Sequence, residues 1–259
     1  MGTFLFDKII FGPVKSRRLG VSLGINLLPV NQKICSFNCI YCECGLNPEH
    51  PLPGNKMPSR LEVKESLEKQ LKKMSSENNP PDVITFAGNG EPTLHKDFDK
   101  IVDDTIELRN SLSPKAKIAV LSNGSKISSP KVFNALLKVD DNILKLDSAF
   151  KETVELIDRP AGEYSHTKTV NEYKKFKGRL IVQTLFLKGT YNEKIVDNTT
   201  EKEIDEWLKA IKEIKPQEVM IYTIARDTPV TSLKKTNIEK LKEIAAKVEK
   251  LGIPTQVSE

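Results

Sequence analysis

Short apolar runs recur along this chain, and segments with helical periodicity lie between them. The runs occupy residues 83–86, 118–121, 143–146, 180–187 and 219–224. A short apolar run, then a helix, then another run is typical of parallel strands joined by helical crossovers. A further strand at about residues 21–28 gives six strand–helix units. The pattern therefore predicts an α/β fold.

The segments between the runs carry helix start signals. In a capping box, a cap hydroxyl and a later carboxylate satisfy orphan backbone amides. Three segments have this form: Ser59-x-x-Glu62, Thr200-x-x-Glu203 and Thr236-x-x-Glu239. Ser129 and Pro130 predict a fourth start, with proline at the first helical position. Trp207 belongs to an apolar helix face, so we expect it in the core.

The cysteines carry the strongest chemical signal. Cys35, Cys39 and Cys42 lie within eight residues at CxxxCxxC spacing. Three thiolates can hold three irons of a [4Fe–4S] cluster and leave the fourth iron open to a small molecule. A four-thiolate zinc site that includes Cys44 is the alternative, although zinc sites more often present CxxC pairs separated by a longer loop. A disulfide is less expected, because no apolar signal segment opens the chain.

This spacing, with the aromatic Tyr41 just before the third cysteine, resembles the cluster loop of the radical S-adenosylmethionine (SAM) superfamily. The resemblance implies that SAM chelates the open iron. An electron from the cluster then splits SAM into methionine and a 5′-deoxyadenosyl radical, which abstracts hydrogen from a substrate. The resemblance also implies a partial (βα)6 TIM-like barrel with an N-terminal extension and with reactive loops at the C-terminal ends of the strands.

Two further segments resemble SAM-binding motifs of the superfamily. Residues 88–92, Gly-Asn-Gly-Glu-Pro, are similar to its GGEP motif, whose backbone binds the SAM amino group. Asn89 stands where the first glycine of the usual pair would be. Residues 122–124, Ser-Asn-Gly, look like a segment that borders the SAM site. The resemblance implies that these residues contact the cofactor: Gly88, Asn89, Gly90, Ser122 and Asn123.

Lys145 and Asp147 are two apart on the fourth predicted strand and therefore project from the same face. Activating enzymes of glycyl-radical proteins carry an Asp-x-Lys pair that contacts SAM, and here the order is reversed. One interpretation is that Asp147 reaches the SAM ribose or amine while Lys145 balances its charge. The other is a structural ion pair.

The later strands supply weaker candidates. Alternation allows only one of Gln183 and Thr184 to face the barrel interior. The resemblance implies that Ile224 lies where the superfamily packs adenine, with core packing as the competing interpretation, and that Tyr41 is a further cofactor contact. Arg226 could bind a carboxylate or phosphate of the substrate, with a surface salt bridge as the competing interpretation.

The segments at 12–20 and 23–26, together with the motifs above, narrow the resemblance. They are similar to small radical SAM oxidoreductases related to the wyosine-synthesising tRNA enzyme (4-demethylwyosine synthase-like). The similarity covers roughly residues 11–226. Wyosine-forming enzymes have additional cysteines for a second cluster, whereas this chain has only Cys44 beyond the first set. We therefore expect no second cluster and no wyosine synthesis.

Composition sets the remaining expectations. We expect one domain over residues 1–259, with an extension (1–20), a barrel core (21–226) and a C-terminal helix and tail (227–259). The formal charge is +5, from 40 basic and 35 acidic residues. Most of this charge indicates a solvated surface, although mild positive charge would help an acidic electron donor or an RNA to approach. No apolar stretch is long enough for a membrane span, so we expect a cytoplasmic protein.

The leading hypothesis is an anaerobic radical SAM oxidoreductase or transferase with one cluster, SAM, and reduced ferredoxin or flavodoxin as electron donor. A tRNA base, gripped in part by Arg17 and Arg18, is one candidate substrate. Activation of a glycyl-radical enzyme and peptide modification are the alternative activities. From another class, the alternative is an iron–sulfur electron carrier or redox sensor, which normally supplies four cysteines. The sequence identifies no catalytic residue on the substrate side.

Overall fold

The computed structural model describes residues 4–16, 20–50 and 52–259, and the chain divides into two compact units. The N-terminal unit comprises Leu5–Cys35 and Asn47–Asn142. The C-terminal unit comprises Met1–Phe4, Ser36–Leu46 and Ile143–Glu259. The single domain expected over 1–259 stays a prediction. Arg17 and Arg18 lie outside the described residues.

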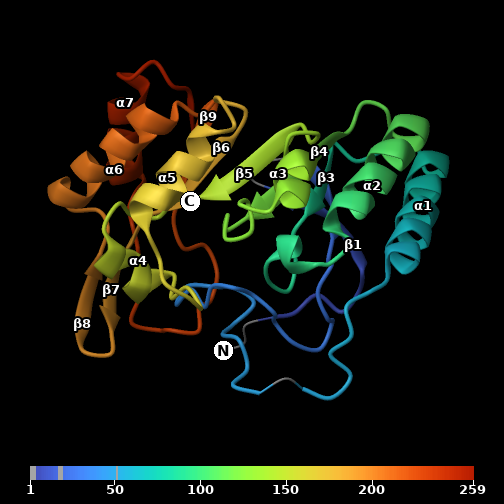
Figure 1. Cartoon of the computed structure of the whole chain (residues 1–259), viewed down its shortest axis with the longest axis horizontal. Coiled ribbons are helices and arrows are strands. Elements are labelled where there is room, and N and C mark those ends of the chain that lie inside the picture. Colours follow the sequence, from blue (N-terminus) through green and yellow to red (C-terminus); the bar gives the residue numbers. More distant parts are fainter. Residues whose placement is uncertain (1–3, 17–19, 51) are drawn as a thin grey trace. The chain divides into compact units, whose positions relative to one another are not determined.

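The N-terminal unit holds four neighbouring strands in the order β1-β2-β3-β4. The first two form an antiparallel hairpin, and β2, β3 and β4 run parallel. Helices α1 and α2 lie side by side (Figure 1). The elements are β1 (Ile10–Ser16), β2 (Gly20–Ile25), α1 (Arg60–Ser76), β3 (Val83–Phe86), the short 3₁₀ helix η1 (Pro92–Leu94), α2 (Phe98–Leu112), β4 (Lys117–Ser122) and α3 (Pro130–Leu136).

The C-terminal unit repeats the parallel arrangement, with β5, β6, β9 and β11 as successive neighbours. A small antiparallel sheet, ordered β10-β7-β8, accompanies it. Strand β5 begins at the end of the N-terminal unit. The elements are β5 (Asp141–Lys145), α4 (Lys151–Ile157), α5 (His166–Lys174), β6 (Ile181–Leu185), β7 (Leu187–Tyr191), β8 (Lys194–Asp197), α6 (Glu201–Ile214), β9 (Glu218–Tyr222), β10 (Lys234–Lys235), α7 (Ile238–Glu249) and β11 (Thr255–Ser258).

The strand and helix predictions are largely confirmed. Each predicted run overlaps a strand, and the capping box at Ser59 has both of its hydrogen bonds. Trp207 is 1% exposed, and its indole Nε1 donates to the Leu146 carbonyl (3.1 Å) and to Thr184 Oγ1 (3.1 Å). The buried indole thus belongs to the core.

Three expectations need correction. The cap of α7 is Asn237, because the Thr236 hydroxyl is buried and donates to the Phe186 carbonyl instead (3.0 Å). The run at 180–187 is two strands, since the chain turns at Phe186 from β6 into β7. The expected tail contains β11, which pairs parallel with β9.

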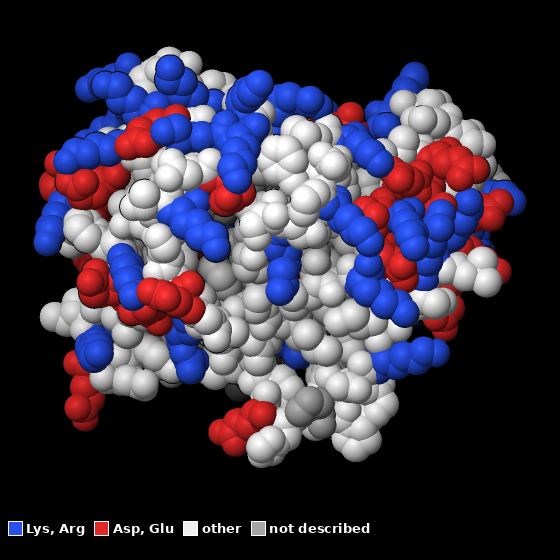
Figure 2. Space-filling view, viewed as in Figure 1, with Lys and Arg blue, Asp and Glu red and all other residues white. Residues whose placement is uncertain are grey.

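The surface has no single sign. On the face drawn in Figure 2, acidic side chains lie among the basic ones. Within the described ranges, no helix combines the length and the apolar character needed to cross a membrane.

Candidate functional site

The cysteine loop is shared between the two units along the chain. Cys35 ends a segment of the N-terminal unit, while Cys39 and Cys42 belong to the C-terminal unit. The chain turns between Cys39 and Cys42, and the Cys42 N–H donates to the Cys39 carbonyl (3.2 Å). All four cysteines are present as thiols. In the described part of the chain, no three His, Cys, Asp or Glu side chains are already grouped to hold a metal ion, so the ligand roles of Cys35, Cys39 and Cys42 stay predictions.

In the N-terminal unit, the glycine loop after β3 lies against the residue before Cys35. The Ile34 N–H donates to the Asn89 carbonyl (2.9 Å), and the Glu91 N–H donates to the Ile34 carbonyl (3.1 Å). Gly90 adopts φ +136°, and a Cβ built on it would lie 1.8 Å from the Ile34 oxygen. Only glycine permits this approach. Gly88, at φ +138°, is similarly close to Asn26.

Asn89 is fully buried and uses its whole side chain. Its Oδ1 accepts from the Phe6 N–H (2.8 Å), and its Nδ2 donates to the carbonyls of Phe6 (2.9 Å) and Pro29 (2.8 Å). Its own N–H donates to Asn26 Oδ1 (3.1 Å). The side chain that replaces a family glycine therefore contacts the N-terminal segment.

Glu91 connects the loops that follow β3 and β4. Its buried carboxylate accepts from Ser122 Oγ (2.8 Å), from the Asn123 N–H (2.7 Å) and from Thr93. Burial raises the pKa of the Glu91 carboxyl despite the opposing effect of these hydrogen bonds. The glutamate of the motif was not among the predicted site residues, yet it brings predicted residues of two loops together.

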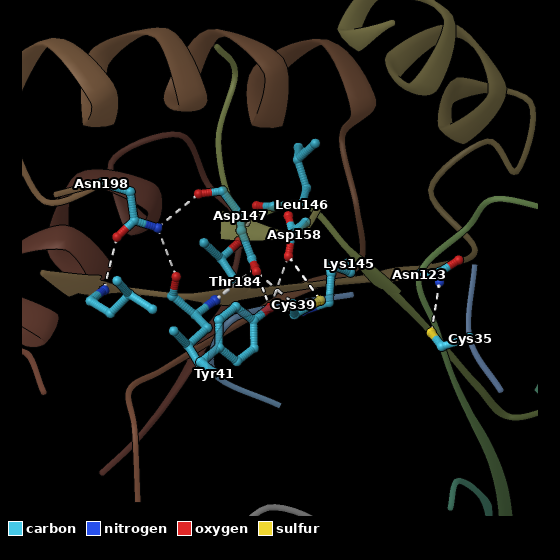
Figure 3. A network of polar contacts seen from close by, with 12 residues as sticks. Cys35, Cys39, Tyr41, Asn123, Lys145, Leu146, Asp147, Asp158, Thr184 and Asn198 are labelled. Atoms are coloured by element: carbon cyan, nitrogen blue, oxygen red, sulfur yellow. Dashed lines mark hydrogen bonds and ion pairs between the residues drawn. The ribbon is translucent and has the colours of Figure 1, made fainter. Parts of the chain in front are cut away.

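Asn123 is the contact between the second loop and the first cysteine. Its Nδ2 donates to Cys35 Sγ at 3.5 Å (Figure 3). Its Oδ1 accepts from the Ser125 N–H (3.0 Å), which fixes the side chain in a turn. The structure thus brings Ser122, Asn123 and Cys35 together with the glycine loop in one unit.

The C-terminal unit contains a second polar cluster, built around Tyr41 (Figure 3). Lys145 Nζ donates to Tyr41 Oη and lies 3.1 Å from Asp147 Oδ2. The Tyr41 hydroxyl donates to Asp147 and, at 3.1 Å, to Asp158 Oδ1. Cys39 Sγ donates to the same Asp158 oxygen (3.3 Å). We call these five residues the tyrosine cluster.

Burial and mutual charge shift the ionisation of the tyrosine cluster. Burial, then Asp147, raises the pKa of Asp158 to about 8. Burial followed by the two carboxylates also raises the pKa of Tyr41 well above its usual range. For Lys145, burial lowers the pKa, but Asp147 and other neighbouring groups outweigh it and the pKa rises well above its usual range. A charged Lys145 beside a protonated Asp158 is the state these shifts favour near neutral pH.

Backbone contacts hold the tyrosine cluster in register. The Asn38 N–H donates to the Asp158 carbonyl (2.9 Å), and the Ile40 N–H donates to the Ile157 carbonyl (2.9 Å). The Leu185 N–H donates to Asp147 Oδ1 (3.0 Å). No motif marks Asp158 in the sequence, so only the fold could reveal its contact with the cysteine loop.

The remaining candidates lie on the later strands and the segment after β9. Thr184 donates to the Leu146 carbonyl (2.8 Å) on the Trp207 side, so Gln183, paired in register with Lys145, lies on the other face. Ile224 is half-buried just after β9. Arg226 forms the salt bridge weighed from the sequence, with Glu43 at 2.9 Å.

Residues 32–198 match the family model described as the radical SAM superfamily. This match covers more than half of the chain, so the chain belongs to the radical SAM superfamily, and the resemblance read from its motifs is confirmed. One relative is of similar length and is named a UPF0026 protein. The UPF0026 protein of Synechocystis sp. is 30% identical over 276 residues, with 95% of each chain covered.

Other relatives are longer than this chain. The GTPase Obg of Brachyspira hyodysenteriae is 33% identical over 243 residues, and the match covers 92% of this chain but 33% of that protein. The UPF0026 protein of Helicobacter pylori is 33% identical, with 70% of this chain and 57% of its own length covered. The chain thus spans between a third and somewhat over half of these relatives.

Solved structures share the fold. A radical SAM methyltransferase from Sphaerobacter thermophilus has a TM-score of 0.68 at 12% identity, over 92% of this chain and 65% of that one. Archaeal TYW1 has a TM-score of 0.53 at 11% identity, over 88% and 71%. These likenesses show the fold alone, and they confirm the predicted α/β class with a partial TIM-like barrel.

The residues present fit the cofactors that the family implies. Cys35, Cys39 and Cys42 offer three sulfur donors within eight residues. Gly88 and Gly90 allow their loop to pack directly on Asn26 and on Ile34, the residue before Cys35. The loop that resembles the SAM-binding motif therefore lies beside the first cysteine of the donor set.

Proposed function

We propose that this chain is a radical SAM enzyme in which Cys35, Cys39 and Cys42 hold one [4Fe–4S] cluster. When bound, the cluster and SAM would supply the 5′-deoxyadenosyl radical that abstracts hydrogen from the substrate. The observation that carries the proposal is the hydrogen-bonded contact of Ile34, the residue before the first cysteine, with Asn89 and Glu91 of the glycine loop. It joins the two motifs that this chemistry needs.

The chain's own residues would have separate tasks. The loop at Gly88–Gly90 would receive the SAM amino group, and Ser122 and Asn123 would border the same cofactor. Tyr41, Asp147 and Ile224 are the expected contacts from the C-terminal unit. In support, Tyr41 and Asp147 are fixed by several hydrogen bonds each, which favours pre-organised binding.

Reduced ferredoxin or flavodoxin in the cytoplasm is the proposed electron donor, and the substrate class stays open. A tRNA base is supported by the sequence resemblance, while on the face drawn in Figure 2 acidic side chains lie among the basic ones, which weakens the attraction of a phosphate backbone. The solved structure of SuiB from Streptococcus suis with a precursor peptide shares the fold, at TM-score 0.61 and 15% identity over 90% of this chain and 48% of that one. Peptide modification is therefore tested beside modification of tRNA.

Anaerobic reconstitution tests the proposal. The protein should bind about four irons and, with a strong reductant, release methionine and 5′-deoxyadenosine from SAM. Alanine at Cys35, Cys39 or Cys42 should remove the cluster, and Cys44→Ala is the matched control that should keep it. A reducible cluster without SAM cleavage would instead identify an electron carrier. Faster cleavage with bulk tRNA than with a peptide pool would select RNA as the substrate class.

A further inference from the structure

Asn89 departs from the family motif, and its surroundings explain what the departure does. Glycine at this position has no side chain, whereas Asn89 uses both amide N–H donors and accepts one hydrogen bond at its carbonyl oxygen. Two of these bonds go to the N–H and the carbonyl of one residue, Phe6. The side-chain amide therefore pairs with the arm Leu5–Ile9 as a neighbouring strand would.

The arm is also packed at its other end. The Phe6 ring stacks on Phe11, with ring centroids 3.6 Å apart and an interplanar angle of 20°. Phe11 covers Gly24, where a Cβ would lie 2.1 Å from the ring. The Ile9 carbonyl accepts from the Asn26 N–H (2.7 Å). The arm is thus a built part of the N-terminal unit, and Asn89 joins it to the glycine loop.

The backbone of the same residue lies in the glycine loop. The Asn89 N–H donates to Asn26 Oδ1, and its carbonyl accepts from the Ile34 N–H. One buried residue therefore connects the arm, the end of β2 and the residue before Cys35. A loop fixed from several sides before binding loses less conformational entropy when a ligand arrives.

From this arrangement we infer that Asn89 is a positioning residue, whose side chain uses the N-terminal arm to hold the SAM-binding loop in shape. The inference rests on the proposed function, because it takes the loop at 88–90 as the SAM site. The arm thus supports the loop through a side-chain contact that a glycine at position 89 could not make. Its expected consequence is that SAM affinity depends on a hydrogen bond from Phe6.

Two substitutions break this connection from opposite sides. Asn89→Gly restores the family glycine and removes the amide. Phe6→Pro removes the N–H that donates to Asn89, and Phe6→Ala is its control because it loses the same ring and keeps the N–H. Equilibrium binding of SAM to the reconstituted protein should weaken about tenfold in Asn89→Gly and in Phe6→Pro, and less in Phe6→Ala. The double variant should bind no more weakly than either single one, since both remove one connection.

Hydrogen exchange provides a readout that general destabilisation would not reproduce. In the wild-type protein, SAM should slow exchange in the arm, and in Asn89→Gly this protection should be lost while the rest of the N-terminal unit keeps its exchange rates. SAM affinity within twofold of wild type in both variants, or losses that add in the double variant, would overturn the inference. If the wild-type reconstituted protein binds no SAM, the proposed function fails first. Arm exchange in the SAM-free variants then shows separately whether Asn89 holds the arm.

Discussion

The two polar regions of the candidate site are built from different chemistry. The glycine loop in the N-terminal unit is held by backbone groups and neutral amides, with Glu91 as its only carboxylate among the contacts described above. The tyrosine cluster in the C-terminal unit instead combines an ammonium, a phenol, a thiol and two carboxyl groups. Amide networks hold their geometry over a wide pH range, whereas the ionised cluster holds it only while its charges balance. The two regions should therefore be destabilised by different changes: the tyrosine cluster by altered charge and the glycine loop by added side-chain volume.

The largest effect should come from unbalancing the tyrosine cluster. Lys145→Met leaves Asp147 buried without its cation, and breaking a buried pair in this way costs about 3–5 kcal/mol of unfolding free energy. Urea unfolding of the protein without its iron–sulfur cluster measures this loss of unfolding free energy. Lys151→Met is the matched control, because Lys151 forms an exposed pair with Glu155 (3.7 Å) and should not change stability measurably. Equal stability of both variants would contradict a structural role for the Lys145–Asp147 pair.

The glycine loop with its amide contacts (the amide region) should be destabilised by added side-chain volume rather than by a change of charge. Gly90→Ala forces a Cβ against the Ile34 carbonyl at a strained φ, with an expected loss of about 2–4 kcal/mol. Gly162→Ala is its control, since nothing lies within 4 Å of the added Cβ. The urea midpoint should fall only for Gly90. A normal midpoint in Gly90→Ala would mean that the loop yields easily and does not fix Ile34.

A pH series should separate the regions further. The Asp158 carboxyl titrates at about 8 in the folded protein against 3.8 ordinarily, so between these values the folded state holds the extra proton. Raising the pH therefore favours unfolding, by about 1 kcal/mol per unit. In the protein without its iron–sulfur cluster, the Asp158 contribution to the unfolding free energy should be fully present below pH 4 and should fall towards pH 8. Asp158→Asn should flatten the decrease of unfolding free energy with pH. An unchanged decrease would show that other groups cause it.

The smallest effect concerns one hydrogen bond of the amide region. Ser122→Ala removes one of the donors to buried Glu91 and should cost about 1–2 kcal/mol. Ser76→Ala removes an exposed hydroxyl at the end of α1 and serves as control. Thermal unfolding of both variants at constant pH measures the difference. A loss no larger than in the control would show that the remaining donors satisfy Glu91.

Sequence reasoning reached the strands, the helix starts and the motif residues because local pattern encodes them. The run at 83–86 coincides with β3, and the capping box at Ser59 opens α1. It did not reach Asp158, whose contact with Cys39 depends on how the chain returns after α4. The partner of Asn89 was equally hidden, because Phe6 lies 83 residues away in sequence. Long-range hydrogen bonds of this kind leave no periodicity to read.

The hydrogen bonds of the glycine loop also bear on chemical ageing. Asn89 and Asn123 each precede a glycine. In Asn-Gly pairs the glycine nitrogen readily attacks the side-chain carbonyl carbon of the asparagine and expels ammonia, and water then opens the resulting succinimide to leave a carboxylate. Here the Gly90 N–H donates to the Gly88 carbonyl (2.8 Å), and the Gly124 N–H donates to Ser122 Oγ (3.0 Å). In the folded protein, both glycine N–H groups are therefore hydrogen-bonded, which slows their attack on the asparagine side chains. Each excursion to the unfolded state exposes them, so stored or heated protein should acquire acid at these two positions first.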